Sequence, residues 1–211
     1  MSNLIAHELL MFKMQYMIRK LTCEDFLSED VVSLARFFLG KYLVCVSKEG
    51  CVGAWITETE AYGGIEDLAS HAAGGRRTNR TKTMYERGGI AYVYLCYGIH
   101  RMLNFVTGPE GLPYAVLIRA VKIEEGKSLA ARRRKTTDPV RLGSGPGCVT
   151  QALGIHLKDN GLKLTGNRLW IEDHGIKISQ SEIEQAPRVG VDYAGEIWAK
   201  KPWRMIWKNM A

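Results

Sequence analysis

The sequence of 211 residues lacks the patterns that mark metal-binding and disulfide-rich proteins. Its cysteines are odd in number and include no CxxC pair, so they form neither a disulfide framework nor a zinc ligand set. There is also no HExxH motif for a metal and no GxxxxGK[ST] loop for phosphate. We therefore expect reduced thiols in a cytosolic protein that uses no metal and no cofactor. The five cysteines are Cys23, Cys45, Cys51, Cys96 and Cys148.

Long hydrophobic runs and cleavage signals are missing as well. The first twenty residues mix apolar side chains with His7, Glu8, Lys13, Arg19 and Lys20, and contain no small-residue cleavage site. We expect a protein that is neither secreted nor membrane-bound, placed in the cytoplasm at a bacterial nucleoid or in a eukaryotic nucleus. No internal repeat or long linker divides the chain, which predicts an N-terminal extension over 1–20 and one domain over 21–211.

Positive charge is what the chain has in excess, with a formal net charge of +7. This excess favours a polyanionic partner, nucleic acid first and an acidic membrane second, over a merely basic soluble protein. Arg76, Arg77, Arg80 and Lys82 stand among threonines and an asparagine, and a second basic group spans 132–135. Such donor-rich loops suit phosphate oxygens, although a solvated charged loop is the alternative.

Hydrophobic patterning predicts a mixed α/β fold rich in strands. We expect a helix in the segment 25–41, with its polar cap at Ser28 and Asp30 and its stop at Gly40. A hairpin of 42–47 and 51–62 follows, and then an antiparallel meander. The meander strands are 90–96, 99–107 and 114–123, and later elements are a helical stretch over 124–138, a glycine-rich turn opening a short helix over 141–155, and strands over 169–173 and 176–179.

The segment "WITETEAYGG" (55–64) holds the first candidates for chemistry. In a strand, Glu58, Glu60 and Tyr62 share one face because side chains alternate between the two faces. Paired carboxylates can serve acid–base catalysis when their surroundings move their pKa values apart. The alternative is an exposed edge strand with solvated acids, but the neighbouring aromatic ring favours a lined pocket.

The first meander strand carries aromatic residues on one face and ends in another. Tyr92, Tyr94 and Cys96 alternate, and Tyr97-Gly98 forms the bend. A tyrosine at a hairpin tip has little core to reach, so on a basic protein it can insert between bases as a wedge. Packing in a small surface cluster is the alternative. We expect "GSGPG" at 143–147 to be only a turn.

Several segments together resemble the alkyladenine DNA glycosylase family, the 3-methyladenine DNA glycosylases of the mammalian type. They are "ITETEAYGGIEDLASHAAGGRRTNRTKTMY", "GGIAYVYLCYGIHRMLNFVT", "AVLIRAV", "GSGPGCVTQALGI" and "RVGVDYAGEIWAKKPWR", and the resemblance covers about residues 22–207. It implies a single α+β domain around a curved antiparallel sheet, with surrounding helices and a protruding β-hairpin. It also implies a monomer that acts on double-stranded DNA carrying a damaged purine.

The resemblance implies catalytic roles by position. Glu60 matches the general base that activates water against C1′ of the flipped nucleotide. Arg119 matches the residue that helps hold this water, and the backbone carbonyl of Val189 its third contact. Glu58 is assigned no role.

Other matched positions concern the base and the DNA. Tyr62 on one side, with His71 and Tyr94 on the other, resembles the sandwich around the extruded base. Asn104 matches the residue that crowds the exocyclic amino group of guanine. The residues expected to contact DNA are the wedge Tyr97, Gly98, Arg76 and Arg80.

One position departs from the family, which commonly has lysine where this chain has Cys148 after Gly147. No Schiff-base lysine stands at the matched pocket positions, so we expect simple hydrolysis without strand cutting. The expected substrate class is 3-methyladenine, 7-methylguanine, hypoxanthine and ethenoadenine, in no particular order. A catalytically silent nucleic-acid-binding module is one alternative. A carbohydrate glycosidase using Glu58 and Glu60 is another, but the several exposed tryptophans of a sugar cleft are missing.

Overall fold

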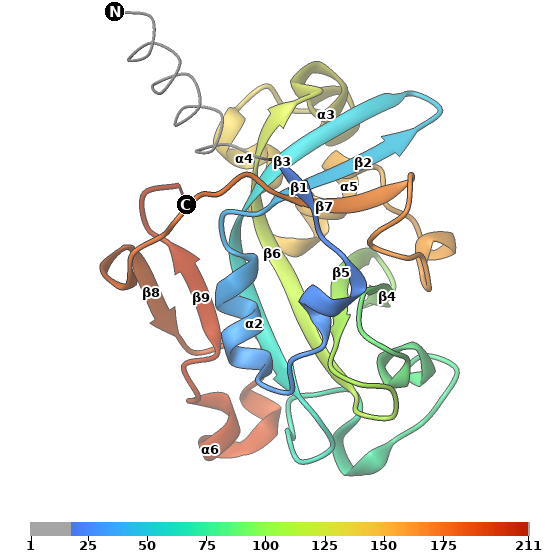
Figure 1. The fold of residues 1–211 in the computed structure, drawn as a ribbon, viewed down its shortest axis with the longest axis vertical. Coiled ribbons are helices and arrows are strands. Elements are labelled where there is room, and N and C mark those ends of the chain that lie inside the picture. The colour runs from blue at the N-terminus through green and yellow to red at the C-terminus, as the bar shows by residue number, and fades with distance from the viewer. Residues whose placement is uncertain (1–17, 211) are drawn as a thin grey trace, which may run out of the picture.

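The computed structural model describes residues 18–210, which form one curved antiparallel sheet with helices around it (Figure 1). This confirms the single mixed α/β domain expected from the sequence. The strands are β1 (Arg19–Lys20), β2 (Tyr42–Ser47), β3 (Gly50–Gly63), β4 (Ile90–Cys96), β5 (His100–Thr107), β6 (Tyr114–Glu125), β7 (Leu169–Asp173), β8 (Ile183–Ala186) and β9 (Arg204–Trp207). The helices are α2 (Val31–Phe38), α3 (Lys127–Arg134), α4 (Pro139–Gly143), α5 (Pro146–Leu153) and α6 (Gly195–Ala199).

The long strand β3 organises the sheet. The strands follow the order β1-β7-β2-β3-β6-β5-β4, with β6 beside β3 along nearly its whole length. On its other edge β3 changes partner, because its first half pairs with β2 and Glu58–Glu60 pair with β9. The register against β6 shifts around Glu58, between Ile56 and Thr59, and such bulges bend a strand. Glu60 therefore lies between two strands at the point where the sheet branches.

One face of the sheet packs on the hydrophobic core. On this face the Thr59 hydroxyl donates to the carbonyl of Ala35 in α2 at 2.7 Å. Phe38 of α2 packs edge-on against Phe105 of β5, with 5.2 Å between ring centroids, and Phe26 joins them at 5.3 Å from Phe38. Because strand side chains alternate, the neighbours of these core residues point to the opposite face. That opposite face carries the candidate site.

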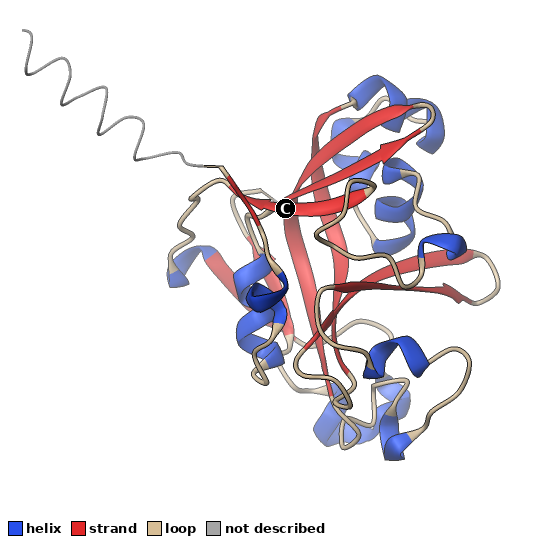
Figure 2. Cartoon of the chain, turned by 45° about the vertical axis from the view of Figure 1, so that its right-hand side comes forward, coloured by secondary structure: helices blue, strands red, loops and turns tan. Residues whose placement is uncertain are grey.

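The meander of β4, β5 and β6 confirms the predicted antiparallel hairpins. The break between β4 and β5 falls at Tyr97-Gly98, as expected, and the β4–β5 hairpin extends to the right-hand edge of the molecule in Figure 2. The hairpin of β2 and β3 is confirmed as well.

One helix prediction is confirmed and one strand prediction was wrong. The helix expected in the segment 25–41 has its cap at Asp30, whose carboxylate accepts from the Ser33 backbone N–H, so α2 begins at Val31 and a separate short 3-10 helix at Cys23–Phe26 precedes it. The strand expected over 176–179 is absent from the described chain. Its Ile178 side chain instead packs against the core beside Gly40, whose positive φ of 70° turns the backbone between α2 and β2.

Strands β1, β8 and β9 and helices α4 and α6 were not predicted. In β9 the buried side chains of Met205 and Trp207 alternate with more exposed neighbours, as is typical of a strand. We did not predict this strand because the segment is rich in basic and aromatic residues. Most of the expected N-terminal extension, 1–17, lies outside the described residues, so the boundary at 20/21 stays a prediction. Within 18–210 no helix is long and apolar enough to cross a membrane.

Candidate active site

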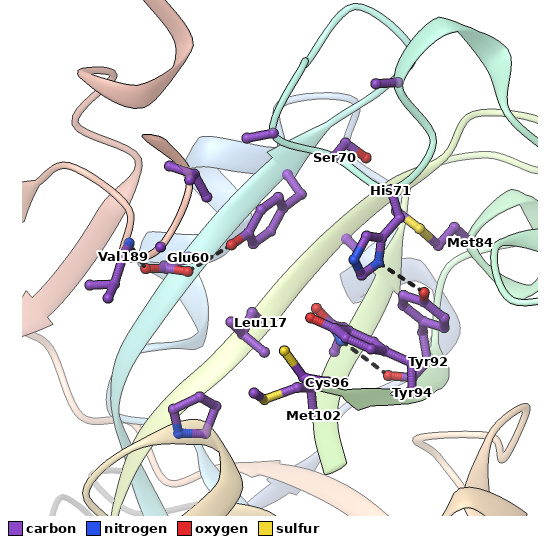
Figure 3. Close-up of a pocket in the computed structure, with 18 of the residues that line it drawn as sticks. Glu60, Ser70, His71, Met84, Tyr92, Tyr94, Cys96, Met102, Leu117 and Val189 are labelled. Carbon is purple, nitrogen blue, oxygen red and sulfur yellow. Dashed lines mark hydrogen bonds between the residues drawn. The ribbon is translucent and has the colours of Figure 1, made fainter. Parts of the chain in front are cut away.

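A row of residues across four strands lines the candidate site. Glu60 of β3 pairs with Leu117 of β6, Leu117 pairs with Asn104 of β5, and Asn104 pairs with Tyr92 of β4. Directly paired residues project from the same face of a sheet, so these four side chains lie side by side. They line an open cavity of about 710 Å³ (Figure 3). Strand register alone thus brings together residues that are up to 57 positions apart in the sequence.

Nearly every site residue predicted from the sequence lines this cavity. The exception is Gly98, which lies at the hairpin tip beyond it. The predicted residues that line it are Glu60, Tyr62, His71, Arg76, Arg80, Tyr94, Tyr97, Asn104, Arg119 and Val189.

Glu60 is fully buried, with 0% of its surface exposed, and is held by donors on both oxygens. Its Oε1 accepts the Val189 backbone N–H at 2.8 Å and lies 3.4 Å from Nη1 of Arg119. Its Oε2 accepts the Tyr62 hydroxyl at 2.8 Å. Burial raises the pKa of Glu60, while Arg119, the Val189 N–H and the Tyr62 hydroxyl oppose that rise. The carboxylate is therefore fixed in position and costly to ionise, as a general base in a pocket would be.

Glu58 differs from Glu60 although both are on the same strand. Its Oε1 accepts from Arg119 Nε at 3.1 Å and from Arg204 Nη1 at 2.9 Å, and it does not line the cavity. Arg119 thus bridges the two carboxylates. This arrangement makes Glu58 part of the support for Arg119.

Val189 reaches the site through its backbone. The resemblance implies a role for its carbonyl oxygen, whereas the contact present is the N–H donated to Glu60. The carbonyl role stays a prediction.

Aromatic rings stand on both sides of the cavity. Glu60 and Val189 lie on one side, next to Tyr62, and His71 and Tyr94 lie on the other (Figure 3). The His71 ring is edge-on to Tyr94, with 4.6 Å between centroids. Aromatic side chains thus bound the cavity on two sides.

The neutral state of His71 follows from its partners. Arg80 donates from Nη2 to His71 Nε2 at 3.1 Å, and because a guanidinium only donates, this nitrogen accepts. The ring proton is then on Nδ1, which donates to the Tyr92 hydroxyl at 3.1 Å. Burial, together with the charges of Arg80 and Arg76, lowers the pKa of His71 to about 4. An uncharged imidazole does not repel a cationic base.

Asn104 is buried in the cavity floor. Its Nδ2 donates to the backbone carbonyl of Tyr92 at 3.2 Å, which fixes the side chain between β5 and β4. Leu117 is its partner on β6, Met102 lies two residues before it on β5, and both line the cavity with it. A rigid, buried amide is therefore part of the cavity floor.

The tip of the β4–β5 hairpin is exposed, in contrast to the buried cavity floor. Tyr97 is 88% exposed and has a positive φ of 49°, and Gly98 follows with a φ of 73°. Nothing lies within 4 Å of a side chain that would be added at Gly98, so glycine is there for its backbone conformation. The turn presents the Tyr97 ring to solvent at the mouth of the cavity.

The two basic groups of the sequence are separated in space. Arg76 and Arg80 line the cavity, and Arg80 also lies over the Tyr94 ring, 4.6 Å from its centroid. The group 132–135 lies at the end of α3, where Arg133 donates to Glu49 in the β2–β3 turn and to Ser47 at the end of β2. Ten residues of β3 separate that turn from Glu60, about 30 Å of strand, so the two groups lie at opposite ends of the sheet (Figure 1).

Sequence reasoning missed several residues around the site. Tyr193 lines the cavity and donates to the Ala69 carbonyl at 3.0 Å, Arg204 holds Glu58, and a buried pair of Asp67 and Arg188 lies behind Tyr62. Arg188 and Tyr193 stand in the segment "RVGVDYAGE", in which only Val189 was singled out.

Cys148 is half-buried in the first turn of α5, beside Pro146 at the cavity wall. Among residues 18–210 no three His, Cys, Asp or Glu side chains form a group able to hold a metal ion.

Comparison with known proteins agrees with this geometry. The model of the methylpurine-DNA glycosylase family matches residues 25–211. The chain belongs to this family. It is 46% identical over 183 residues to a Chlamydia pneumoniae protein, covering 86% of this chain and 91% of that one. A Bdellovibrio bacteriovorus protein is 44% identical over 88% of this chain and 94% of its own, and a Bacillus cytotoxicus protein 40% over 87% and 94%.

Membership of the methylpurine-DNA glycosylase family confirms the family predicted from the sequence. The three relatives are all named provisionally as 3-methyladenine DNA glycosylases. The predicted enzyme class, a DNA glycosylase of DNA repair, is thereby confirmed, and DNA is its substrate.

Proposed function

We propose that this member of the methylpurine-DNA glycosylase family removes alkylated and deaminated purines from double-stranded DNA after flipping the nucleotide out of the duplex. The class is 3-methyladenine, 7-methylguanine, hypoxanthine and ethenoadenine. The protein acts as a monomer in the compartment that holds the DNA, and it hydrolyses the N-glycosidic bond without cutting the strand.

The observation that carries the proposal is the state of Glu60. A buried carboxylate held by a tyrosine hydroxyl, a backbone N–H and a nearby guanidinium stands at the wall of a cavity lined by aromatic rings. Burying a carboxylate costs stability, which is a reason to expect that Glu60 has a function. Its raised pKa lies closer to neutral pH than that of an ordinary glutamate. Both features suit a base that accepts a proton from water.

The reaction balances as a hydrolysis. The bond between C1′ and the purine nitrogen breaks, and its electron pair leaves with the base, so the sugar gains oxocarbenium character. A water oxygen forms the new bond to C1′ while its proton passes to Glu60, which then releases it to solvent. A cationic purine leaves as a neutral base, whereas a neutral purine leaves with a negative charge and takes up a proton from solvent. Arg119, beside Glu60, and the Val189 backbone carbonyl are the proposed further contacts of this water. The negative charge of Glu60 also stabilises the positive charge developing on the sugar.

The aromatic walls suit the base that leaves. Purines alkylated at N3 or N7 are cationic, and a cation over an aromatic ring gains about 0.5–2 kcal/mol. Tyr62 on one side, with His71 and Tyr94 on the other, is the proposed sandwich. Asn104, held to the Tyr92 carbonyl, is proposed to reject guanine by crowding its exocyclic amino group.

Extrusion of the nucleotide needs support from outside the cavity. Unstacking a base costs a few kcal/mol, least for a damaged pair, and a ring placed in the gap offsets part of this cost. Tyr97 on the tight Tyr97-Gly98 turn is the proposed wedge. Arg76 and Arg80 at the cavity mouth are proposed to contact the DNA.

The alternatives explain less of the geometry. A silent binding module needs no buried carboxylate at the cavity wall. A carbohydrate glycosidase needs two carboxyl groups on either side of the scissile bond. Glu58 is instead tied to Arg119 and Arg204 and does not line the cavity.

A glycosylase assay tests the proposal. Duplexes that carry each of the four lesions are incubated with the protein and divided into samples with and without alkali. We expect abasic sites for at least one lesion, visible as strand breaks only after alkali. Release of no base from any duplex would contradict the activity, and breaks without alkali would contradict simple hydrolysis.

A further inference from the structure

Behind the Tyr62 ring lies a buried ion pair that the proposed reaction does not use. The guanidinium of Arg188 makes two bonds to the carboxylate of Asp67, from Nη1 at 2.5 Å and from Nη2 at 2.9 Å. Both side chains are 0% exposed. Two backbone N–H groups, of Gly63 and Ala69, also donate to Asp67 at 3.0 Å each. The charge of Arg188 is thus compensated by one carboxylate in a site without access to water.

The pair is separated from the cavity by one aromatic ring. The Arg188 guanidinium lies 4.8 Å from the centroid of Tyr62 and 5.0 Å from that of Trp203. Tyr62 lines the cavity, whereas Arg188 and Asp67 do not. Because Tyr62 lines the cavity and Arg188 does not, we infer that the guanidinium lies on the side of the ring away from the cavity.

A charge behind a ring changes what the front of the ring attracts. A cation on one face competes for the same π density that would attract a cationic base on the other. It also repels that base directly, since a stacked base lies within about 10 Å of it. A neutral base is affected much less. The carboxylate of Asp67 cancels both effects as long as it balances the guanidinium.

We propose that Asp67 determines the specificity of the pocket between cationic and neutral damaged bases, because it neutralises Arg188 behind the Tyr62 ring. This inference rests on the proposed function, in which Tyr62 stacks on the extruded base. Asp67 does not touch the substrate, and it acts through Arg188 and Tyr62. Cationic 7-methylguanine and neutral hypoxanthine are the two bases to compare, since both pair with cytosine in a duplex.

The test measures binding, so that chemistry does not enter. Duplexes carry a 2′-fluoro nucleotide of 7-methylguanine or hypoxanthine opposite cytosine, because the fluorine disfavours the oxocarbenium-like transition state and blocks excision. For Asp67→Asn we expect the ratio of the two dissociation constants to move roughly tenfold against 7-methylguanine. The double variant Asp67→Asn with Arg188→Gln removes both charges and should return the ratio to that of the wild type. Asp67→Glu keeps the charge and should also leave the ratio close to the wild type.

Loss of stability is controlled separately, because an uncompensated buried charge weakens the fold. Thr59 is on β3 like Tyr62, but its side chain is on the core face of the sheet. Thr59→Val removes a buried hydrogen bond there and should leave the ratio of dissociation constants unchanged. If Asp67→Asn does not fold, Arg188→Gln alone leaves a carboxylate behind the ring, and the ratio should move in favour of 7-methylguanine. Equal losses for both bases in either single variant would overturn the role of Asp67. Excision of neither unmodified lesion by the wild type would instead contradict the proposed function.

Discussion

Glu60 and Tyr97 mark the two ends of the same cavity and could hardly differ more in their surroundings. Glu60 has no exposed surface and hydrogen bonds to both carboxylate oxygens, whereas Tyr97 is 88% exposed on a turn of positive φ. Side chains that perform chemistry have to be held in a fixed position. A side chain that enters DNA has to be free of the protein until the DNA arrives. The comparison indicates that fixed geometry belongs to the Glu60 wall and that adaptable contact belongs to the hairpin tip.

The largest expected effect comes from changing the fixed end. Glu60→Gln keeps the shape of the side chain but removes the base, so single-turnover excision should fall by orders of magnitude while damaged DNA still binds. Glu58→Gln is the matched control on the same strand, and it should lose much less because it only weakens the support of Arg119. The order would be reversed if Glu58 were the base.

The pH dependence of excision should come next in size. Burial raises the pKa of Glu60, and the carboxylate is the active form, so the rate should fall about tenfold per pH unit below a midpoint above the ordinary value of about 4.3. His71, with a pKa of about 4, stays neutral at pH values well above 4, so the fall in rate at those pH values reports Glu60. Because the folded-state pKa of Glu60 lies above its unfolded value, ionisation destabilises the fold as pH rises through that interval. A pH–rate profile whose acidic midpoint lies at or below the ordinary pKa of glutamate would contradict this assignment.

Salt dependence tests the arginines near the tip, with a smaller expected effect. Removing one contact to a phosphate should flatten the slope of log K against log salt by roughly 0.9. Arg76→Ala and Arg80→Ala should each do so, but Arg132→Ala at the far end of the sheet should not. An unchanged slope in both cavity variants, or a flatter one in Arg132→Ala, would mean that DNA follows another surface.

Removal of metal ions should have no effect at all. Catalysis by a buried carboxylate needs no Lewis acid, and the cysteines and histidines have no ligand spacing in the sequence. Excision rates should be equal before and after dialysis against EDTA. A loss that zinc restores would contradict the mechanism.

The sequence predicted those parts of the fold and site that depend on local pattern. Period-two alternation placed Glu58, Glu60 and Tyr62 on one face, and the break at Tyr97-Gly98 placed the hairpin tip. The strand expected over 176–179 failed because its apolar residues cover the core without pairing their backbone.

Long-range contacts were beyond the reach of pattern. Glu58 pairs with Arg204 and Asp67 pairs with Arg188, and the partners in each pair are more than 120 residues apart in the sequence. Both pairs form because β9 and the loop before it pack beside β3. Family resemblance named the residues of the cavity, but it did not reveal what holds them.

The most direct test of the difference between the two ends compares one lesion in two settings. Hypoxanthine is placed either in a base-paired duplex or in a single-nucleotide bulge, where extrusion costs little. We expect Tyr97→Ser, with its melting temperature nearly unchanged, to lose far more rate on the paired lesion than on the bulge. Glu60→Gln should lose the same large factor on both. Equal losses for Tyr97→Ser in the two settings, or ready unfolding of that variant, would contradict the account.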